Sequence, residues 1–243
     1  MSQKLRLLDL FSGVGGFSLG LERSGGFETI AFAEVDPYAS RVLAKHWPST
    51  PNLGDVTTAE YPDADAIAAG FPCQDLSNAG KRAGLAGERS GLWREVVRAV
   101  RVVRPRFVLL ENVAALLGRG LGKVLGDLAS HGYDTEWDCI PASHVGAPHG
   151  RDRWWAVAYP ERGERWQEPY LRSLGRMGRE QQSVPWDRDW QGALREFRGM
   201  DDGSAYRVDR FDTLRNGLVP QIPEMIGRLL SSPSAPQPSG AHK

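Results

Sequence analysis

Apolar residues recur along the first part of the chain with two alternating periods. Short apolar runs typical of buried strands lie at residues 4–11, 28–33, 65–69, 106–110, 133–140 and 154–158. Between them, apolar residues with helical spacing lie at residues 17–22, 37–46, 92–104 and 123–131. Strands that alternate with helices in this way are typical of a parallel sheet with helices on both faces. The pattern therefore predicts an α/β fold with a doubly wound sheet.

The pattern changes at Tyr159. Residues 159–211 are rich in Arg, Glu, Trp, Gly and Gln and show little apolar periodicity, whereas a helical segment returns at 222–230. Interleaved aromatic and basic residues suit nucleic acid, although a disordered or degraded insert would have a similar composition. We divide the chain into a first domain, a small insert, a C-terminal helix that returns to the first domain, and a tail expected to be disordered, at residues 1–158, 159–211, 212–230 and 231–243.

Composition narrows the class of protein. A chain of 243 residues with 41% apolar residues can bury a large core, and no apolar run approaches the roughly 20 residues of a membrane helix. The N-terminal residues lead straight into a strand without a signal-peptide pattern, so we expect a cytoplasmic protein without a membrane partner. Two cysteines make neither a disulfide framework nor a zinc site, and we expect no metal. A formal net charge of zero neither favours nor excludes nucleic acid.

Cys73 lies where the predicted strand at 65–69 gives way to an open loop, within Gly-Phe-Pro-Cys-Gln-Asp-Leu-Ser at 70–77. Pro72 fixes its own φ angle and so stiffens the approach to the cysteine. A thiol is a good nucleophile only as a thiolate, which needs electropositive surroundings. The glycine-rich loop that follows supplies three basic residues, Lys81, Arg82 and Arg89. This segment alone is equally compatible with a catalytic cysteine and a small buried apolar residue.

A glycine-rich turn joins the first predicted strand to the first predicted helix, in Asp-Leu-Phe-Ser-Gly-Val-Gly-Gly at 9–16. Such a turn lets a ligand approach the backbone N–H groups of a helix N-terminus, although the third glycine of the G-x-G-x-x-G dinucleotide fingerprint is missing. Glu34 ends the second predicted strand, where an acidic residue can accept hydrogen bonds from ribose hydroxyls. Asp36 precedes Pro37, which favours a helix N-cap at Asp36.

Charged residues also follow or precede later strands. Glu111 follows the continuous apolar run at 106–110, and a carboxylate in that position faces the crevice of an α/β sheet or caps the next helix. Partial desolvation there could raise its pKa enough for proton exchange with a base ring. Arg151 and Arg153 are two residues apart before an apolar strand, so they point the same way. Four arginines of the predicted 92–104 helix are interpreted as its solvated face: Arg94, Arg98, Arg101 and Arg104.

These segments occur in the order found in the DNA (cytosine-5)-methyltransferases, and the chain resembles that family over most of residues 5–158 and again over 206–230. The resemblance implies a Rossmann-like S-adenosylmethionine-dependent methyltransferase sheet, with residues 159–211 as a small irregular target-recognition insert. It implies catalytic roles for Cys73, Glu111, Arg151 and Arg153, and substrate contacts for Gln74, Ser77 and Arg89. It implies that S-adenosyl-L-methionine contacts Asp9, Phe11, Gly13, Gly15, Gly16, Glu34, Val35, Asp55, Pro72 and Asn216.

The chain departs from the family pattern at a few positions. Val35 replaces a common aromatic residue, which predicts thinner stacking on adenine, and Arg215 replaces a glycine. His149 and Gly150 replace the Gln-Arg that begins the family's Gln-Arg-Arg-x-Arg pattern, so neither is assigned a role. Asp55 has an alternative role as a turn residue that accepts a hydrogen bond from its own backbone.

The resemblance implies methyl transfer to C5 of a flipped-out cytosine in double-stranded DNA, through a covalent Cys73 adduct at C6. We expect a monomer in a prokaryotic or phage-infected cell, with a cognate restriction endonuclease as a candidate partner. Two alternatives stay open: an RNA cytosine-5 methyltransferase of the same fold, and a catalytically inactive DNA-binding relative. A nicotinamide dehydrogenase is excluded because it leaves Cys73 and Glu111 without a role.

Overall fold

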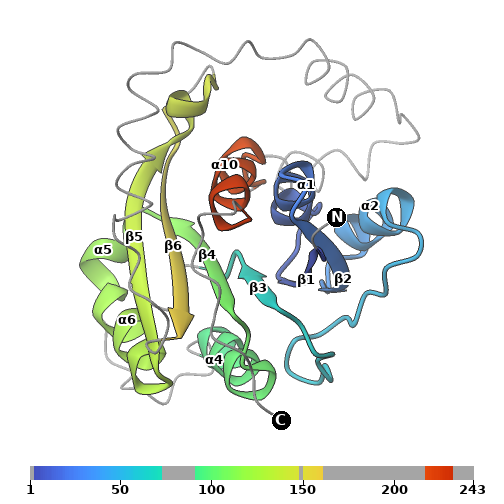
Figure 1. Ribbon diagram of the computed structural model, residues 1–243, viewed down its shortest axis with the longest axis horizontal. Helices are drawn as coiled ribbons and strands as arrows, with labels where there is room; N and C mark the ends of the chain where they lie inside the picture. The colour runs from blue at the N-terminus through green and yellow to red at the C-terminus, as the bar shows by residue number, and fades with distance from the viewer. Residues whose placement is uncertain (1–2, 73–90, 148–149, 161–216, 232–243) are drawn as a thin grey trace.

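The computed structural model describes residues 3–72, 91–147, 150–160 and 217–231 (Figure 1). Within these ranges the strands form a six-stranded sheet in the order β2-β1-β3-β4-β6-β5. Four of them pair in parallel: β1 (Leu5–Leu10), β2 (Phe27–Ala33), β3 (Ala66–Ala69) and β4 (Phe107–Val113). Strand β6 (Asp152–Pro160) is antiparallel to β4 and to the edge strand β5 (Tyr133–Pro141). The predicted doubly wound α/β sheet is confirmed.

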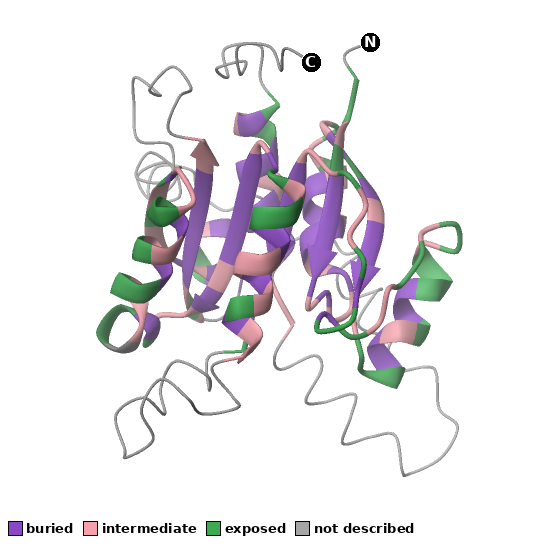
Figure 2. Ribbon diagram, turned by 90° about the horizontal axis from the view of Figure 1, so that it is seen from below, coloured by how far each residue is buried: buried purple, intermediate pink, exposed green. Residues whose placement is uncertain are grey.

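Helices cover both faces of the sheet. They are α1 (Gly16–Arg23), α2 (Pro37–His46), α4 (Gly91–Val103), α5 (Leu116–Arg119), α6 (Leu121–Ser130), α10 (Gln221–Leu230) and the short 3-10 helix η3 (Ala142–Val145). Helices α4 and α6 pack on one face and α1 and α10 on the other, each with its own apolar cluster. Figure 2 shows that the central strands between the two layers are almost wholly buried. No helix in the described ranges is long and apolar enough to span a membrane.

Alternation along β1 explains why one strand contributes to both clusters. Leu8 and Leu10 belong to the cluster beneath α4, whereas Leu7 belongs to the cluster beneath α1 and α10. Successive side chains of a strand point to opposite faces, so a strand apolar at nearly every position is buried on both sides. Asp9 is two residues after Leu7, so its side chain points to the same face, and it is fully buried on the α1 side.

The C-terminal helix returns to the first helix, as expected, and the two pack unusually closely. A Cβ atom added at Gly20 of α1 would meet the carbonyl oxygen of Pro220 and lie 2.6 Å from Cγ of Pro223. A Cβ added at Gly227 of α10 would lie 2.7 Å from Oγ of Ser24. Glycine on both helices therefore lets the two backbones approach, and α10 holds α1 against the sheet.

Most predicted elements are present with small shifts in their ends. The helix predicted at 37–46 is α2 with the same bounds, and the side chain of Asp36 accepts from Ala39 N at 2.7 Å as the predicted N-cap. The strand predicted at 106–110 continues through Val113, because residues 111–113 pair with β6. Glu111 is thus a strand residue and not a helix cap. Strand β6 runs through Pro160, across the boundary expected after residue 158.

The prediction that four arginines form the solvated face of α4 is wrong for Arg98. Arg94, Arg101 and Arg104 are exposed, and Arg104, one residue past the end of α4, donates from Nη1 to His131 O at 2.9 Å. The guanidinium of Arg98 is partly buried and donates to backbone carbonyls of a distant segment. Helical spacing identified the polar side of α4, but it gave no information about backbone carbonyl groups elsewhere in the chain that accept hydrogen bonds from that side.

The close contact between α1 and α10 predicts that Gly20→Ala destabilises the fold. The new methyl group meets backbone atoms, which move less easily than a side-chain tip, so the free energy of unfolding should fall by about 1–3 kcal/mol. Urea denaturation measures the change. The matched control is Gly126→Ala in α6, where a Cβ has no neighbour within 4 Å; it should be neutral or stabilising by about 0.5–1 kcal/mol. Equal effects of the two substitutions would contradict the role of this contact.

Candidate active site

A cleft opens where the parallel strands end. Its volume is about 320 Å³, which is at the lower end of the range of small-molecule sites. It is lined by the turn after β1, by residues that follow β2 and β3, by Glu111 of β4, and by Gly217 and Leu218 ahead of α10. Because the carboxyl ends of parallel strands meet at one edge, residues far apart in the sequence share this cleft.

The turn between β1 and α1 has an unusual backbone. Phe11, Gly13 and Gly15 all have positive φ angles, of 53°, 54° and 84°. For Phe11 this conformation costs about 1–3 kcal/mol and is typical of functional loops. A Cβ at Gly15 would lie 2.6 Å from the Trp47 ring, so a side chain there would displace the indole. Phe11, Gly13 and Gly16 line the cleft, and Gly15 forms the N-cap of α1 behind it.

Glu34 connects this turn to the start of α2. One carboxylate oxygen accepts from Gly13 N and the other from Asp36 N, each at 2.7 Å. Two backbone donors fix the position of the carboxylate at the cleft wall. Each carboxylate oxygen has a further lone pair, so both oxygens can still accept from hydroxyl groups of a ligand.

Asn52 is a residue of the site that the sequence analysis missed. Its Nδ2 donates to Glu34 O at 3.0 Å and to Ser40 Oγ at 3.1 Å, and its Oδ1 accepts from Glu34 N at 3.0 Å and Gly54 N at 3.1 Å. One amide therefore holds both backbone groups of Glu34. The available signal was an asparagine beside Pro51 in a turn, but such a turn does not identify its distant partners.

Glu111 of β4 lies beside Arg153 of β6. Arg153 Nε lies 3.0 Å from Glu111 Oε1, in an ion pair whose side chains are mostly buried. Burial raises the pKa of the Glu111 carboxyl to about 7, against the opposite effects of Arg153 and then Arg151. Glu111 can therefore hold or release a proton near neutral pH, which is what a general acid needs.

The segment leading to Cys73 begins beside Glu111. A Cβ at Gly70 would lie 3.7 Å from Glu111 Oε2, and Asn112 Nδ2 donates to Phe71 O at 2.9 Å. Phe71 also packs on Trp93 of α4, with ring centroids 4.9 Å apart. These contacts anchor the chain up to the exposed Pro72, the last residue described before the cysteine.

Asp9 does not lie among the described residues that line the cleft. Its carboxylate is buried beneath α1, where Oδ2 accepts from Ser18 Oγ at 2.7 Å and Oδ1 has no hydrogen-bond partner in the described ranges. Burial raises the pKa of this carboxyl to about 7. Asp9 is thus placed to support the turn from below, and direct contact with a cofactor stays a prediction.

Two other predicted residues are not among the described residues that line the cleft. Val35 is exposed over 66% of its surface, beside Glu34. Asp55 is also exposed, and its Oδ1 accepts from Thr57 N at 2.8 Å, which lowers the pKa of its carboxyl. Asp55 therefore makes the turn contact of the alternative interpretation, in which it accepts a hydrogen bond from its own backbone. Five predicted site residues lie outside the described ranges: Cys73, Gln74, Ser77, Arg89 and Asn216.

The cleft residues fit S-adenosyl-L-methionine. Its ribose hydroxyls need an acceptor such as Glu34, its carboxylate needs donors such as the N–H groups of the strained turn, and its adenine can pack on Phe11. In the part of the chain that the structure describes, no group of His, Cys, Asp and Glu could hold a metal ion.

Comparisons with known proteins agree with this geometry. The family described as C-5 cytosine-specific DNA methylase matches residues 5–186. Type II methyltransferase M2.BsuMI of Bacillus subtilis is 39% identical over 158 residues, covering 61% of this chain and 40% of that protein. Type II methyltransferase M.HgiCII of Herpetosiphon aurantiacus is 36% identical over 159 residues, covering 62% of this chain and 36% of that protein. The matched part of this chain thus spans about two fifths of the length of these relatives.

Two solved structures share the fold. The S. pombe Dnmt2 methyltransferase superposes with a TM-score of 0.66 over 94% of this chain and 98% of that chain, at 16% identity. A putative DNA modification methyltransferase encoded within an E. coli prophage gives a TM-score of 0.54 at 28% identity, over 65% of this chain and 47% of that chain. Together with the family match over residues 5–186, these findings show that the chain belongs to the C-5 cytosine-specific DNA methylases, a family whose methyl donor is S-adenosyl-L-methionine.

Proposed function

We propose that this protein transfers a methyl group to C5 of a cytosine flipped out of double-stranded DNA. The observation that carries the proposal is the Glu111 carboxyl, which can hold a proton near neutral pH and lies beside Arg153 in the cleft formed by the glycine-rich turn and Glu34. Because the matched relatives are much longer, the substrate and partners of this chain are proposals throughout.

The chemistry begins at a carbon that is not nucleophilic by itself. The Cys73 thiolate adds to C6 of the ring, which places electron density on C5. Glu111 donates its proton to N3 as negative charge develops there, and Arg153 holds O2. After C5 is methylated it loses its proton to water, the C–H electron pair re-forms the C5–C6 double bond and expels the Cys73 thiolate, and N3 returns its proton to Glu111. The ring must leave the base stack for these groups to reach it, at a cost of a few kcal/mol.

S-adenosyl-L-methionine supplies the methyl group when it is bound. Glu34 would accept from its ribose hydroxyls, Phe11 would pack against its adenine, and Asp55 would accept from the adenine amino group. Backbone N–H groups of the glycine-rich turn that are not already bonded to Glu34 or Ser12 would bind its polar end, and Asn216 would complete the contacts. Support for these roles comes from the family pattern and from the cleft, which contains Phe11, Gly13, Gly16 and Glu34.

Double-stranded DNA is the favoured substrate because the matched family consists of DNA methylases. The RNA-directed alternative shares the catalytic motifs, so the catalytic residues do not separate the two. Residues 159–211 are proposed to read the target, and a cognate restriction endonuclease stays a candidate partner. Radiolabelled methyl transfer to duplex DNA and to transfer RNA, measured side by side, tests the proposal: label only in RNA would overturn it in favour of the alternative.

Cys73→Ala should abolish methyl transfer and leave S-adenosyl-L-methionine binding nearly unchanged, because most of the proposed cofactor contacts lie on other segments. Duplex DNA with 5-fluorocytosine at the target should trap the wild type covalently, since C5 then has no proton to lose. Denaturing gel electrophoresis detects the adduct, and calorimetry measures binding. A trapped adduct with Cys73→Ala would assign the nucleophile to another residue.

Glu111→Gln should reduce the transfer rate by at least ~100-fold, because an amide side chain cannot give a proton to N3 and take it back, as a carboxyl group can. In the wild type the donor form exists below the pKa of about 7, so the rate should fall as the pH rises through 7. The variant should lack this step. Rates from pH 5.5 to 9 at saturating substrates measure both effects, and a thermal melt checks that the variant is folded. A normal rate would show that Glu111 is structural.

Glu34→Ala should weaken S-adenosyl-L-methionine binding by about 1–3 kcal/mol, the scale for losing hydrogen bonds to a charged group. Titration calorimetry is the measurement. Glu28→Ala is the control, because Glu28 is an exposed glutamate on the strand that precedes Glu34. If the two variants bind equally well, the ribose contact is assigned to the wrong residue.

A further inference from the structure

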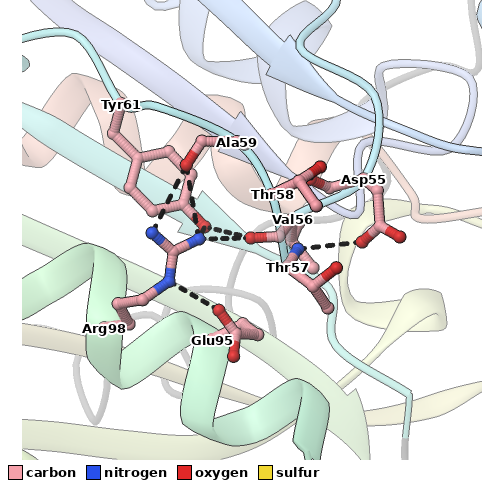
Figure 3. A network of polar contacts seen from close by, with 8 residues as sticks. All are labelled: Asp55, Val56, Thr57, Thr58, Ala59, Tyr61, Glu95 and Arg98. Carbon is pink, nitrogen blue, oxygen red and sulfur yellow. Dashed lines mark hydrogen bonds and ion pairs between the residues drawn. The ribbon is translucent and has the colours of Figure 1, made fainter.

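Arg98 joins several groups of a distant segment to α4. From the middle of α4 its guanidinium donates to Val56 O, to Ala59 O at 3.3 Å and to the Tyr61 hydroxyl at 2.9 Å (Figure 3). Its Nε lies 2.6 Å from Glu95 Oε2, and the guanidinium stands over the Tyr61 ring, 4.6 Å from the centroid. A planar fork with several donors can make such a set of bonds, whereas a lysine cannot.

Apart from Glu95 on α4 itself, the partners of Arg98 all belong to one turn. Thr57 N donates to Asp55 Oδ1 at 2.8 Å, and Ala59 N donates to Asp55 O at 2.9 Å. The Tyr61 hydroxyl donates to Val56 O at 2.9 Å. Asp55 thus begins a closed turn whose Val56 and Ala59 carbonyl groups accept hydrogen bonds from Arg98. We call residues 55–61 the Asp55 turn.

The start of this segment is attached to the cleft wall. Phe32 N donates to Pro51 O at 2.9 Å, and Leu53 N donates to Phe32 O at 2.8 Å. Asn52 holds both backbone groups of Glu34. Residues 51–54 are therefore bound to β2 and Glu34, and the Asp55 turn is bound to α4 through Arg98. Asp55 lies between the two attachments.

We propose that Arg98 is a positioning residue for the cofactor site, which holds the Asp55 turn at the distance from Glu34 that one adenosine group requires. The inference rests on the proposed function, in which Glu34 binds ribose and Asp55 binds adenine. Arg98 touches neither group itself. It acts on the backbone of the turn, and its contacts couple α4 to the adenine end of the cleft.

Loss of these bonds has a specific consequence. Without Arg98 the Asp55 turn keeps its connection at Asn52 and the apolar packing of Val56, but it loses its hydrogen bonds to α4, so ligand binding must order it further. Ordering a loop on binding reduces affinity without adding a contact. Cofactor affinity should therefore fall, while the rate at saturating cofactor stays unchanged, because Glu111 and Arg153 lie on β4 and β6.

The test is calorimetric binding of S-adenosylhomocysteine to the full chain. Arg98→Met keeps the length of the side chain and its packing and should bind about tenfold more weakly. Arg101→Met is the matched control, on the same helix at an exposed position, and should bind as the wild type does. Arg98→Lys keeps the positive charge but not the planar guanidinium, and its affinity for S-adenosylhomocysteine should lie between those of the wild type and Arg98→Met. If Arg98→Met does not fold, Tyr61→Phe, which removes the shared hydroxyl, should still weaken binding severalfold.

A double-mutant cycle separates positioning from general stability. In an Asp55→Ala background, Arg98→Met should cost little further affinity, because the group it positions is gone. Fully additive effects would overturn the inference, as would Arg98→Met binding like the wild type. Loss of rate at saturating cofactor with normal affinity would also overturn it. Failure of the wild type to bind S-adenosylhomocysteine would overturn the proposed function itself, and the inference with it.

Discussion

Parallel pairing of β1 with β2 and β3, and of β3 with β4, is the constraint on which the site depends. It brings the carboxyl ends of four strands to one edge, where the strand order changes direction at β1. The glycine-rich turn, Glu34, Gly70 and Glu111 then share one cleft although about a hundred residues separate the first from the last. Antiparallel β6 adds Arg153 at the same edge, because its N-terminal end pairs with the end of β4.

Two buried carboxyl groups illustrate how position within this frame decides what an acid can do. Burial raises the pKa of both Asp9 and Glu111 to about 7. Asp9 has a neutral partner, Ser18, and lies beneath α1, so its proton is held inside the fold. Glu111 has a cationic partner, Arg153, and opens into the cleft, so its proton can reach a ligand. The same burial cost therefore supports packing in one case and proposed catalysis in the other.

The wall of the cleft is held from two sides. Asn52 binds the backbone of Glu34, and Arg98 binds the backbone of the Asp55 turn. Neither side chain lines the cleft in the described part of the chain. Both act on main-chain groups, which set where the acidic side chains stand. The carboxylates of Glu34 and Asp55, which are proposed to bind adenosine, are thereby positioned by the Asn52 amide and the Arg98 guanidinium. This arrangement explains why an arginine on an amphipathic helix is partly buried.

Local sequence determined the elements whose signals are local. The Asp36–Pro37 pair specified the start of α2 because a cap and a proline act within one turn, and apolar runs specified the central strands because burial on both faces needs them. The order of the motifs was enough to recognise the family.

Tertiary structure decided the rest. Glu111 lies in β4 because residues 111–113 pair with β6, some forty residues later. Arg98 is partly buried because its acceptors are backbone carbonyls, which every residue carries and no sequence pattern marks. Such contacts depend on where the fold brings distant segments, and that is physical information a single sequence pattern does not contain.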